Sequence, residues 1–153
     1  MMNTWFSVRV TFDKVEESGK KVKAKEVYLV DALSFTEAEA RVIGELAYYA
    51  YDDLKVTAMK IEDIAEIFNQ DDAQAEKWYR VKAVFIQLNE KTLKQQKRAQ
   101  ISLVKGKSTE DATKRFHEGM KGTLADYEIH TVSETQFVDV FFYHLERVND
   151  ETR

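Results

Sequence analysis

The sequence repeats itself once, and this repeat limits what the chain can fold into more than any other feature. Residues 5–12 (Trp-Phe-Ser-Val-Arg-Val-Thr-Phe) return 73 positions later as residues 78–85 (Trp-Tyr-Arg-Val-Lys-Ala-Val-Phe). In both segments, apolar residues recur at every second position, which is typical of a strand with one buried face. We therefore predict a tandem duplication in which equivalent side chains lie on equivalent surfaces.

The first half reads as strand, strand, helix, strand. A turn signal at residues 16–20 separates the first strand from a second at 22–30, so the two should form a hairpin. Ser34 followed by Glu37 is a capping box, which predicts the start of a helix. A third strand is expected over residues 54–61. Between the capping Ser34 and this third strand, an apolar stripe at helical spacing contains Ala38, Val42, Leu46 and Tyr49.

The second half repeats these steps. The capping Ser34 recurs as Ser108, and the third strand recurs over residues 127–132. Both halves end in an apolar tail, at residues 64–68 and 137–141. The second tail has the pattern of a strand, whereas the first fits a strand or a helical face equally well.

These patterns predict an α+β fold made of two β-β-α-β(-β) units, with antiparallel sheets, one helix per repeat and pseudo-twofold symmetry. The repeats should cover residues 4–68 and 78–145, joined by the polar segment 69–77. A half of this size supports only a thin core, so we expect residues 1–153 to form a single domain.

Composition and charge limit the cellular compartment and the partners that we expect for this protein. The chain has no cysteine, which excludes disulfides and thiolate catalysis and agrees with a reducing compartment. No basic leader with an apolar core is visible, and no run of about 18 apolar residues occurs. We expect a soluble, cytoplasmic protein without a membrane partner. The net charge of −4 argues against coating nucleic acid by bulk charge, but it leaves room for a local basic patch.

No recognised catalytic or metal motif is present. His130 and Glu128 could share a strand face, yet neither they nor His117 and His144 show an established ligand spacing. The five glycines form no phosphate-binding loop, and neither capping serine lies in a nucleophile elbow. We expect a protein that is not an enzyme and needs no cofactor or metal.

Aromatic and basic residues form the main candidate site. If Phe6 and Val8 face the helix, then Trp5 and Arg9 lie on the opposite face of the sheet. Indole rings beside cations suit single-stranded nucleic acid, because the rings stack on bases and the cations hold phosphates. A basic segment follows, since residues 91–107 hold six basic residues and no acid. The predicted nucleic-acid-binding residues are Trp5, Arg9, Trp78, Arg80, Lys82, Lys91, Lys94, Lys97 and Arg98.

Other interpretations remain open. A tryptophan at a strand start can instead cover the open sheet face, with a cation over its ring, and a lysine-rich hairpin can be a protected sheet edge. The open face and the tail at 137–143 could form a protein-interaction or homodimer contact. A cleft between the halves could hold a small anionic ligand. Its candidate lining residues are Tyr48, Tyr49, Tyr51 and Tyr127.

Several stretches resemble a known family. They are Trp-Phe-x-Val-Arg at 5–9, Tyr-Leu-Val-Asp-Ala-Leu-Ser-Phe-Thr-Glu-Ala-Glu-Ala-Arg at 28–41, Trp-Tyr-x-Val-Lys at 78–82, Gly-Met-x-Gly-Thr at 119–123 and Asp-Tyr-Glu-Ile at 126–129. On these residues the chain resembles the uncharacterised family "domain of unknown function 4494" of Bacteroides-group bacteria and crAss-like phages. The resemblance implies a phage or mobile-element accessory role, and it supplies no activity, cofactor or site residue.

Overall fold

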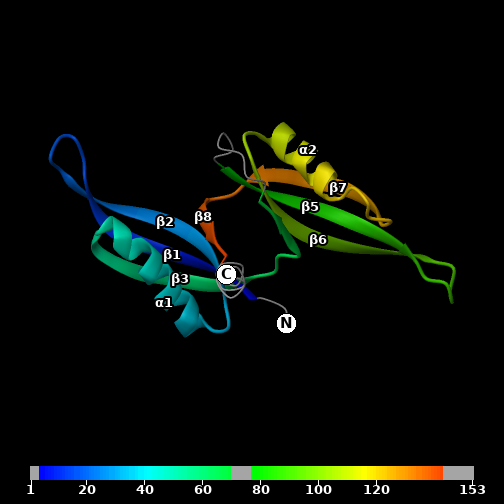
Figure 1. The fold of residues 1–153 in the computed structure, drawn as a ribbon, viewed down its shortest axis with the longest axis horizontal. Helices are drawn as coiled ribbons and strands as arrows, with labels where there is room; N and C mark the ends of the chain where they lie inside the picture. The colour runs from blue at the N-terminus through cyan, green and yellow to red at the C-terminus, as the bar shows by residue number, and fades with distance from the viewer. Residues whose placement is uncertain (1–3, 70–76, 143–153) are drawn as a thin grey trace, which may run out of the picture. The chain divides into compact units, whose positions relative to one another are not determined.

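The computed structural model describes residues 4–69 and 77–142 of the chain. Within them, two α-helices and eight strands form an α+β fold, as the sequence predicted (Figure 1). The strands make two separate four-stranded sheets. The chain divides into two compact units: the first holds the described residues up to Asp63 and from Gln136 onward, and the second holds Ile64–Thr135.

The first unit is a four-stranded sheet with a helix on one face. β1 (Thr4–Val15) pairs antiparallel with both β2 (Lys21–Ala32) and β3 (Asp52–Glu62). β8 (Phe137–Phe141) adds to the other side of β2 in parallel, so the strand order is β3-β1-β2-β8. α1 (Phe35–Leu46) packs on this sheet through a core that includes the apolar residues of β1.

The second unit has the same plan. β5 (Lys77–Leu88) pairs antiparallel with β6 (Gln95–Gly106) and β7 (Asp126–Glu134). β4 (Glu66–Phe68) adds to β6 in parallel, which gives the order β4-β6-β5-β7. α2 (Thr109–Gly119) covers one face of the sheet. Two sheets of matching order, each with one helix, are compatible with a duplication.

Each tail strand pairs with a strand from the other half of the sequence. β4 follows β3 in the chain but pairs with β6, and β8 follows β7 but pairs with β2. The registers agree, because Ile67 pairs with Leu103 in one sheet and Val140 pairs with Leu29 in the other. The first tail is therefore a strand. The compact units differ from the predicted repeats, 4–68 and 78–145, because the tails are exchanged.

Both helices begin at the predicted serine caps. The Ser34 hydroxyl accepts a hydrogen bond from the Glu37 amide at 3.1 Å, and Ser108 accepts one from the Asp111 amide at 3.1 Å. Each bond satisfies an amide that the first helical turn would leave unpaired. The caps thus fix where each helix starts.

The prediction that Tyr49 continues the buried stripe of the first helix is wrong. Ala38, Val42 and Leu46 are buried, but Tyr49 is 66% exposed. α1 ends at Leu46 and continues as a 3₁₀ turn, η1 (Ala47–Tyr49). A 3₁₀ turn has about 3.0 residues per turn instead of 3.6, so Tyr49 rotates away from the stripe.

Candidate nucleic-acid interface

The structure places the predicted residues of β1 and β5 on the sheet faces opposite the helices. In the first unit, Phe6 and Val8 belong to the core under α1, so Arg9 projects from the other face. In the second unit, Val81 belongs to the core under α2, and Lys82 projects from the other face. The alternation in the sequence predicted these faces correctly.

A β-bulge lies beside the cation in both units. Arg9 pairs with Ala58 while Val10 pairs with Val56, which leaves Thr57 as the extra residue. The pairing of Lys82 and Ala83 with β7 shifts in the same way, and the extra residue there is His130. Bulges bend a strand and re-aim its side chains, so both cations stand at an irregular point of their sheet.

The two tryptophans lie in different environments, contrary to the expectation that equivalent side chains lie on equivalent surfaces. Trp78 is 2% exposed, and Lys105 Nζ lies 5.8 Å from the centroid of its ring. Trp5 is half-buried and meets Phe142 edge-on, with 5.6 Å between the ring centroids. Trp78 thus adopts the covered arrangement that was the alternative to base stacking. Its ring has no exposed face for a base.

The basic hairpin between β5 and β6 is exposed. Asn89 organises its turn: the side-chain Oδ1 accepts from the Lys91 amide at 2.9 Å, and the Asn89 carbonyl accepts from the Leu93 amide at 2.7 Å. Four cations of this hairpin are exposed, and across residues 4–69 and 77–142 none of them forms an ion pair with an acid. These hairpin cations are Lys91, Lys94, Lys97 and Arg98.

The hairpin cations do not all lie on one face. Arg98 pairs with Phe85, which packs on the core under α2, so Arg98 lies on the helix side of the sheet. Lys97 pairs with Ile86 and lies on the opposite side, as Lys82 does. Arg80 is half-buried on that same face. Positive charge is therefore present on both faces of the β5–β6 ladder.

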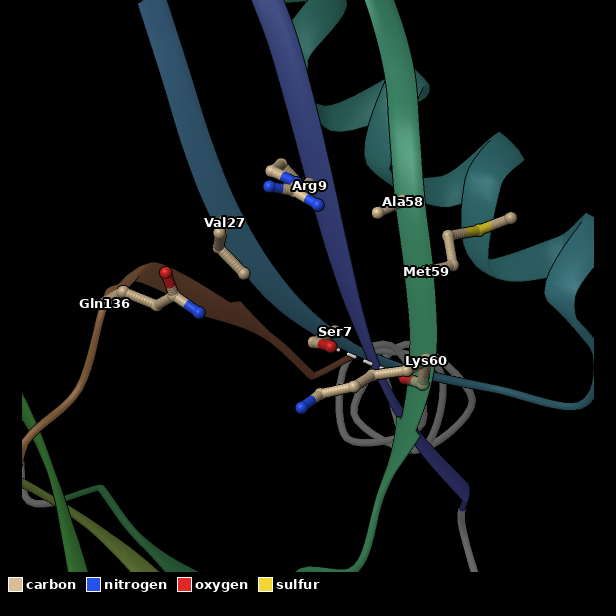
Figure 2. A pocket seen from close by; sticks show the side chains of 7 residues that line it. All are labelled: Ser7, Arg9, Val27, Ala58, Met59, Lys60 and Gln136. Atoms are coloured by element: carbon tan, nitrogen blue, oxygen red, sulfur yellow. Dashed lines mark hydrogen bonds between the residues drawn. The ribbon is translucent and has the colours of Figure 1, made fainter.

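The first unit has a pocket on its open sheet face, beside Arg9 (Figure 2). Its volume is about 280 Å³. Figure 2 shows the Arg9 guanidinium, the Lys60 ammonium and the Gln136 amide around this space, while Met59 points away. The Ser7 hydroxyl also lines it and donates a long hydrogen bond, 3.5 Å, to the Lys60 carbonyl. The complete lining is Ser7, Arg9, Val27, Ala58, Met59, Lys60 and Gln136.

Sequence reasoning found only Arg9 among these residues. The alternation in the third strand could have placed Lys60 on the open face. No sequence signal could have found Gln136, because it reaches this sheet only through the exchange of the tail strands.

Cations near the turn end of the first sheet are paired with acids. Lys23 Nζ lies 3.1 Å from Asp13 Oδ1 and 2.8 Å from Asp53 Oδ2. Hydrogen bonding to Asp53, and then to Asp13, raises the pKa of Lys23, and the hydrogen bond from Lys23 lowers the pKa of Asp53. This cluster is less suited to holding phosphate than the hairpin cations, because carboxylates already balance its charge.

The tyrosines of the predicted ligand cleft have other contacts. Tyr51 stacks on Phe12 with 4.0 Å between ring centroids, and Tyr48 is exposed. Tyr127 packs edge-on against Phe116 at 5.5 Å, within the core of the second unit. Tyr51 and Tyr127 are thus packed side chains, which was the other interpretation of these residues.

The apolar tail strand is used within the chain. Phe137 and Val140 are buried, and β8 pairs with residues 27–30 of β2. Tyr143 and His144 lie outside the described residues.

His117, one of the histidines considered above as a metal ligand, lies 2.7 Å through Nδ1 from the Tyr127 hydroxyl.

None of the helices in the described part of the chain is both long and apolar enough to span a membrane.

Comparison with known proteins gives a family and no function. No curated protein and no solved structure matches the sequence. The family model described as "Domain of unknown function (DUF4494)" matches residues 4–143. Because this match covers nearly the whole sequence, the chain belongs to the DUF4494 family.

Proposed function

We propose that this protein is a non-enzymatic accessory protein of phages or mobile elements that binds single-stranded nucleic acid in the cytoplasm. The single observation that carries the proposal is the set of exposed hairpin cations that pair with no acid among the described residues. The resemblance described above supports the phage context. The protein contacts phosphates with these cations rather than stacking bases on Trp78, which is buried.

The placement of the charge favours a single strand over a duplex. Lys97 and Arg98 project to opposite faces of the same hairpin, so a rigid duplex lying on one face would reach only part of the set. A flexible single strand can pass around the hairpin and contact both. Because the net charge is −4, binding should remain local to the hairpin.

An oligonucleotide titration tests this function. Fluorescence anisotropy with a labelled single-stranded 20-mer should show micromolar binding at ~50 mM salt. Four phosphate contacts on a single strand predict a slope of about −3 for log K against log salt concentration. Replacing all four hairpin cations with glutamine should weaken binding at least tenfold and bring the slope close to zero.

The β1–β2 hairpin provides a matched control. Replacing four of its exposed basic residues with glutamine changes the net charge equally, and this variant should bind as the unmodified protein does. The control residues are Lys14, Lys20, Lys21 and Lys25. Absence of binding by the unmodified protein at ~50 mM salt would refute the proposal. Equal losses in the two variants would also refute it, because bulk charge would then explain the binding.

A further inference from the structure

We infer that the pocket beside Arg9 binds a phosphate group of a small phosphorylated molecule or of a nucleic-acid end. The residues that line this pocket belong to the first unit, whereas the hairpin cations belong to the second, so the inference uses none of the residues of the proposed function. Three observations lead to it: the donors around the pocket, the charge of its lining, and its size.

Hydrogen-bond donors from neighbouring strands converge on the pocket (Figure 2). Ser7 and Arg9 are two positions apart on β1 and therefore share a face. Lys60 pairs directly with Ser7 from β3, and Gln136 adds an amide from the segment just before β8. A guanidinium fork matches two phosphate oxygens, and the ammonium and amide groups can bond the others.

The lining carries positive charge and no carboxylate. Arg9 is exposed and forms no ion pair with any acid that the structure describes. Lys60 Nζ lies 3.4 Å from Glu62 Oε1, so one carboxylate beside the pocket balances part of this charge. The Lys60 side chain is 73% exposed and can turn toward an anion, and Arg9 supplies the unbalanced charge. Val27 and Ala58 lie across from Arg9 on the two neighbouring strands and add apolar surface to the lining.

The size of the pocket suits a phosphate together with part of the group that carries it. A volume of about 280 Å³ holds several water molecules. A bare anion would leave most of this space to solvent. We therefore assign the site to phosphate monoesters, including a nucleotide or a terminal phosphate of an oligonucleotide.

The equivalent position in the second unit also holds two cations. Lys82 stands beside the same bulge as Arg9, and Arg80 occupies the position that corresponds to Ser7. The combination of a bulge with paired cations is thus present in both sheets. In the first unit, this combination borders a pocket.

Two-dimensional amide NMR of the full chain tests the site. Adenosine monophosphate should shift amide resonances of residues 7–9, 58–60 and 136, with a Kd on the order of 1 mM or tighter. Adenosine without phosphate should shift none of them. Arg9→Gln should weaken binding at least tenfold, whereas Arg9→Lys, which keeps the charge but loses the fork, should weaken it less. Lys14→Gln, which removes an exposed cation elsewhere on β1, should have no effect.

Further measurements distinguish a small phosphorylated molecule from a nucleic-acid end. They also distinguish this pocket from the hairpin cations. Shifts with a 5′-phosphorylated oligonucleotide but not with its unphosphorylated form would support the site and identify a nucleic-acid end as the ligand. The variant lacking the hairpin cations should retain monophosphate binding, so failure of the proposed function leaves this inference testable. Equal shifts with adenosine and its monophosphate, or unchanged binding by a folded Arg9→Gln variant, would overturn it.

Discussion

Asp111 ties the start of α2 to the strand before it. Its Oδ2 accepts a hydrogen bond from the Lys107 amide at 2.9 Å and pairs with Arg115 Nε at 2.9 Å. The Lys107 amide and, more weakly, Arg115 hold the pKa of Asp111 below its usual value of 3.8. One carboxylate therefore satisfies a backbone donor and a buried cation together.

The sign of this pKa shift predicts how stability depends on pH. A carboxyl group with a lowered folded-state pKa stabilises the fold above its usual pKa, and the contribution disappears as pH falls through the folded value. Asp111→Asn should therefore lower the free energy of unfolding at pH 7, by less than about 1 kcal/mol because the group is partly exposed. The difference should shrink below pH ~4.

Urea unfolding of both proteins at pH 7 and pH 3 measures this effect. Glu110→Gln, which removes an exposed carboxylate from the same helical turn, is the control and should change stability less. A difference between Asp111→Asn and the unmodified protein that is the same at both pH values would contradict the assignment.

At the scale of elements, α2 and the tail strand β4 are fitted to each other at Gly119. A Cβ atom at this position would lie 2.6 Å from two ring carbons of Phe68. The Phe68 ring in turn meets Phe116 edge-on, with centroids 5.6 Å apart. Any side chain at position 119 must therefore push the aromatic ring of β4 out of place.

A pair of glycine substitutions tests this fit. Gly119→Ala should destabilise the protein by about 1–3 kcal/mol, because it overpacks the contact with Phe68. Gly44→Ala in α1 meets nothing within 4 Å and should stabilise by up to about 1 kcal/mol, because alanine favours a helix. Thermal unfolding of the two variants measures both effects. A stabilising Gly119→Ala would show that Phe68 does not pack there.

Local patterns predicted the elements, but not how distant ones pair. Hydrophobic alternation and the two capping serines predicted the strands, the helix starts and the open-face position of Arg9, because each depends on neighbours in sequence. β4 has only three residues, which are too few for the spacing of apolar residues to distinguish a strand from a helix. The exchange of tails, the bulges and the burial of Trp78 depend on partners far along the chain. Alternation tells which face a side chain takes, but not what covers it.

At the scale of the whole molecule, the exchanged tails predict effects that cross the sequence. Val140→Asp would place a carboxylate at a buried position of β8, near Leu29 of β2. Hydrogen exchange should then lose protection at those amides of residues 27–30 that point toward β8 rather than β1, more than 100 positions away. The amides at 102–104, which β4 covers, should remain protected.

The reciprocal change, Ile67→Asp in β4, is the matched control. It should unprotect those amides of residues 102–104 that point toward β4 rather than β5, and leave 27–30 protected. Uniform loss of protection in both variants would mean that the two sheets do not respond separately.

The exchanged tails also determine which of the two sheets has all its strands first during translation. Domains made during translation usually fold from the N-terminus onward. Here the sheet that starts at Thr4 waits for Phe141, whereas the sheet of Ile64–Thr135 has all its strands once Glu134 has left the exit tunnel. The unit that begins first on the nascent chain is therefore the last to be completed.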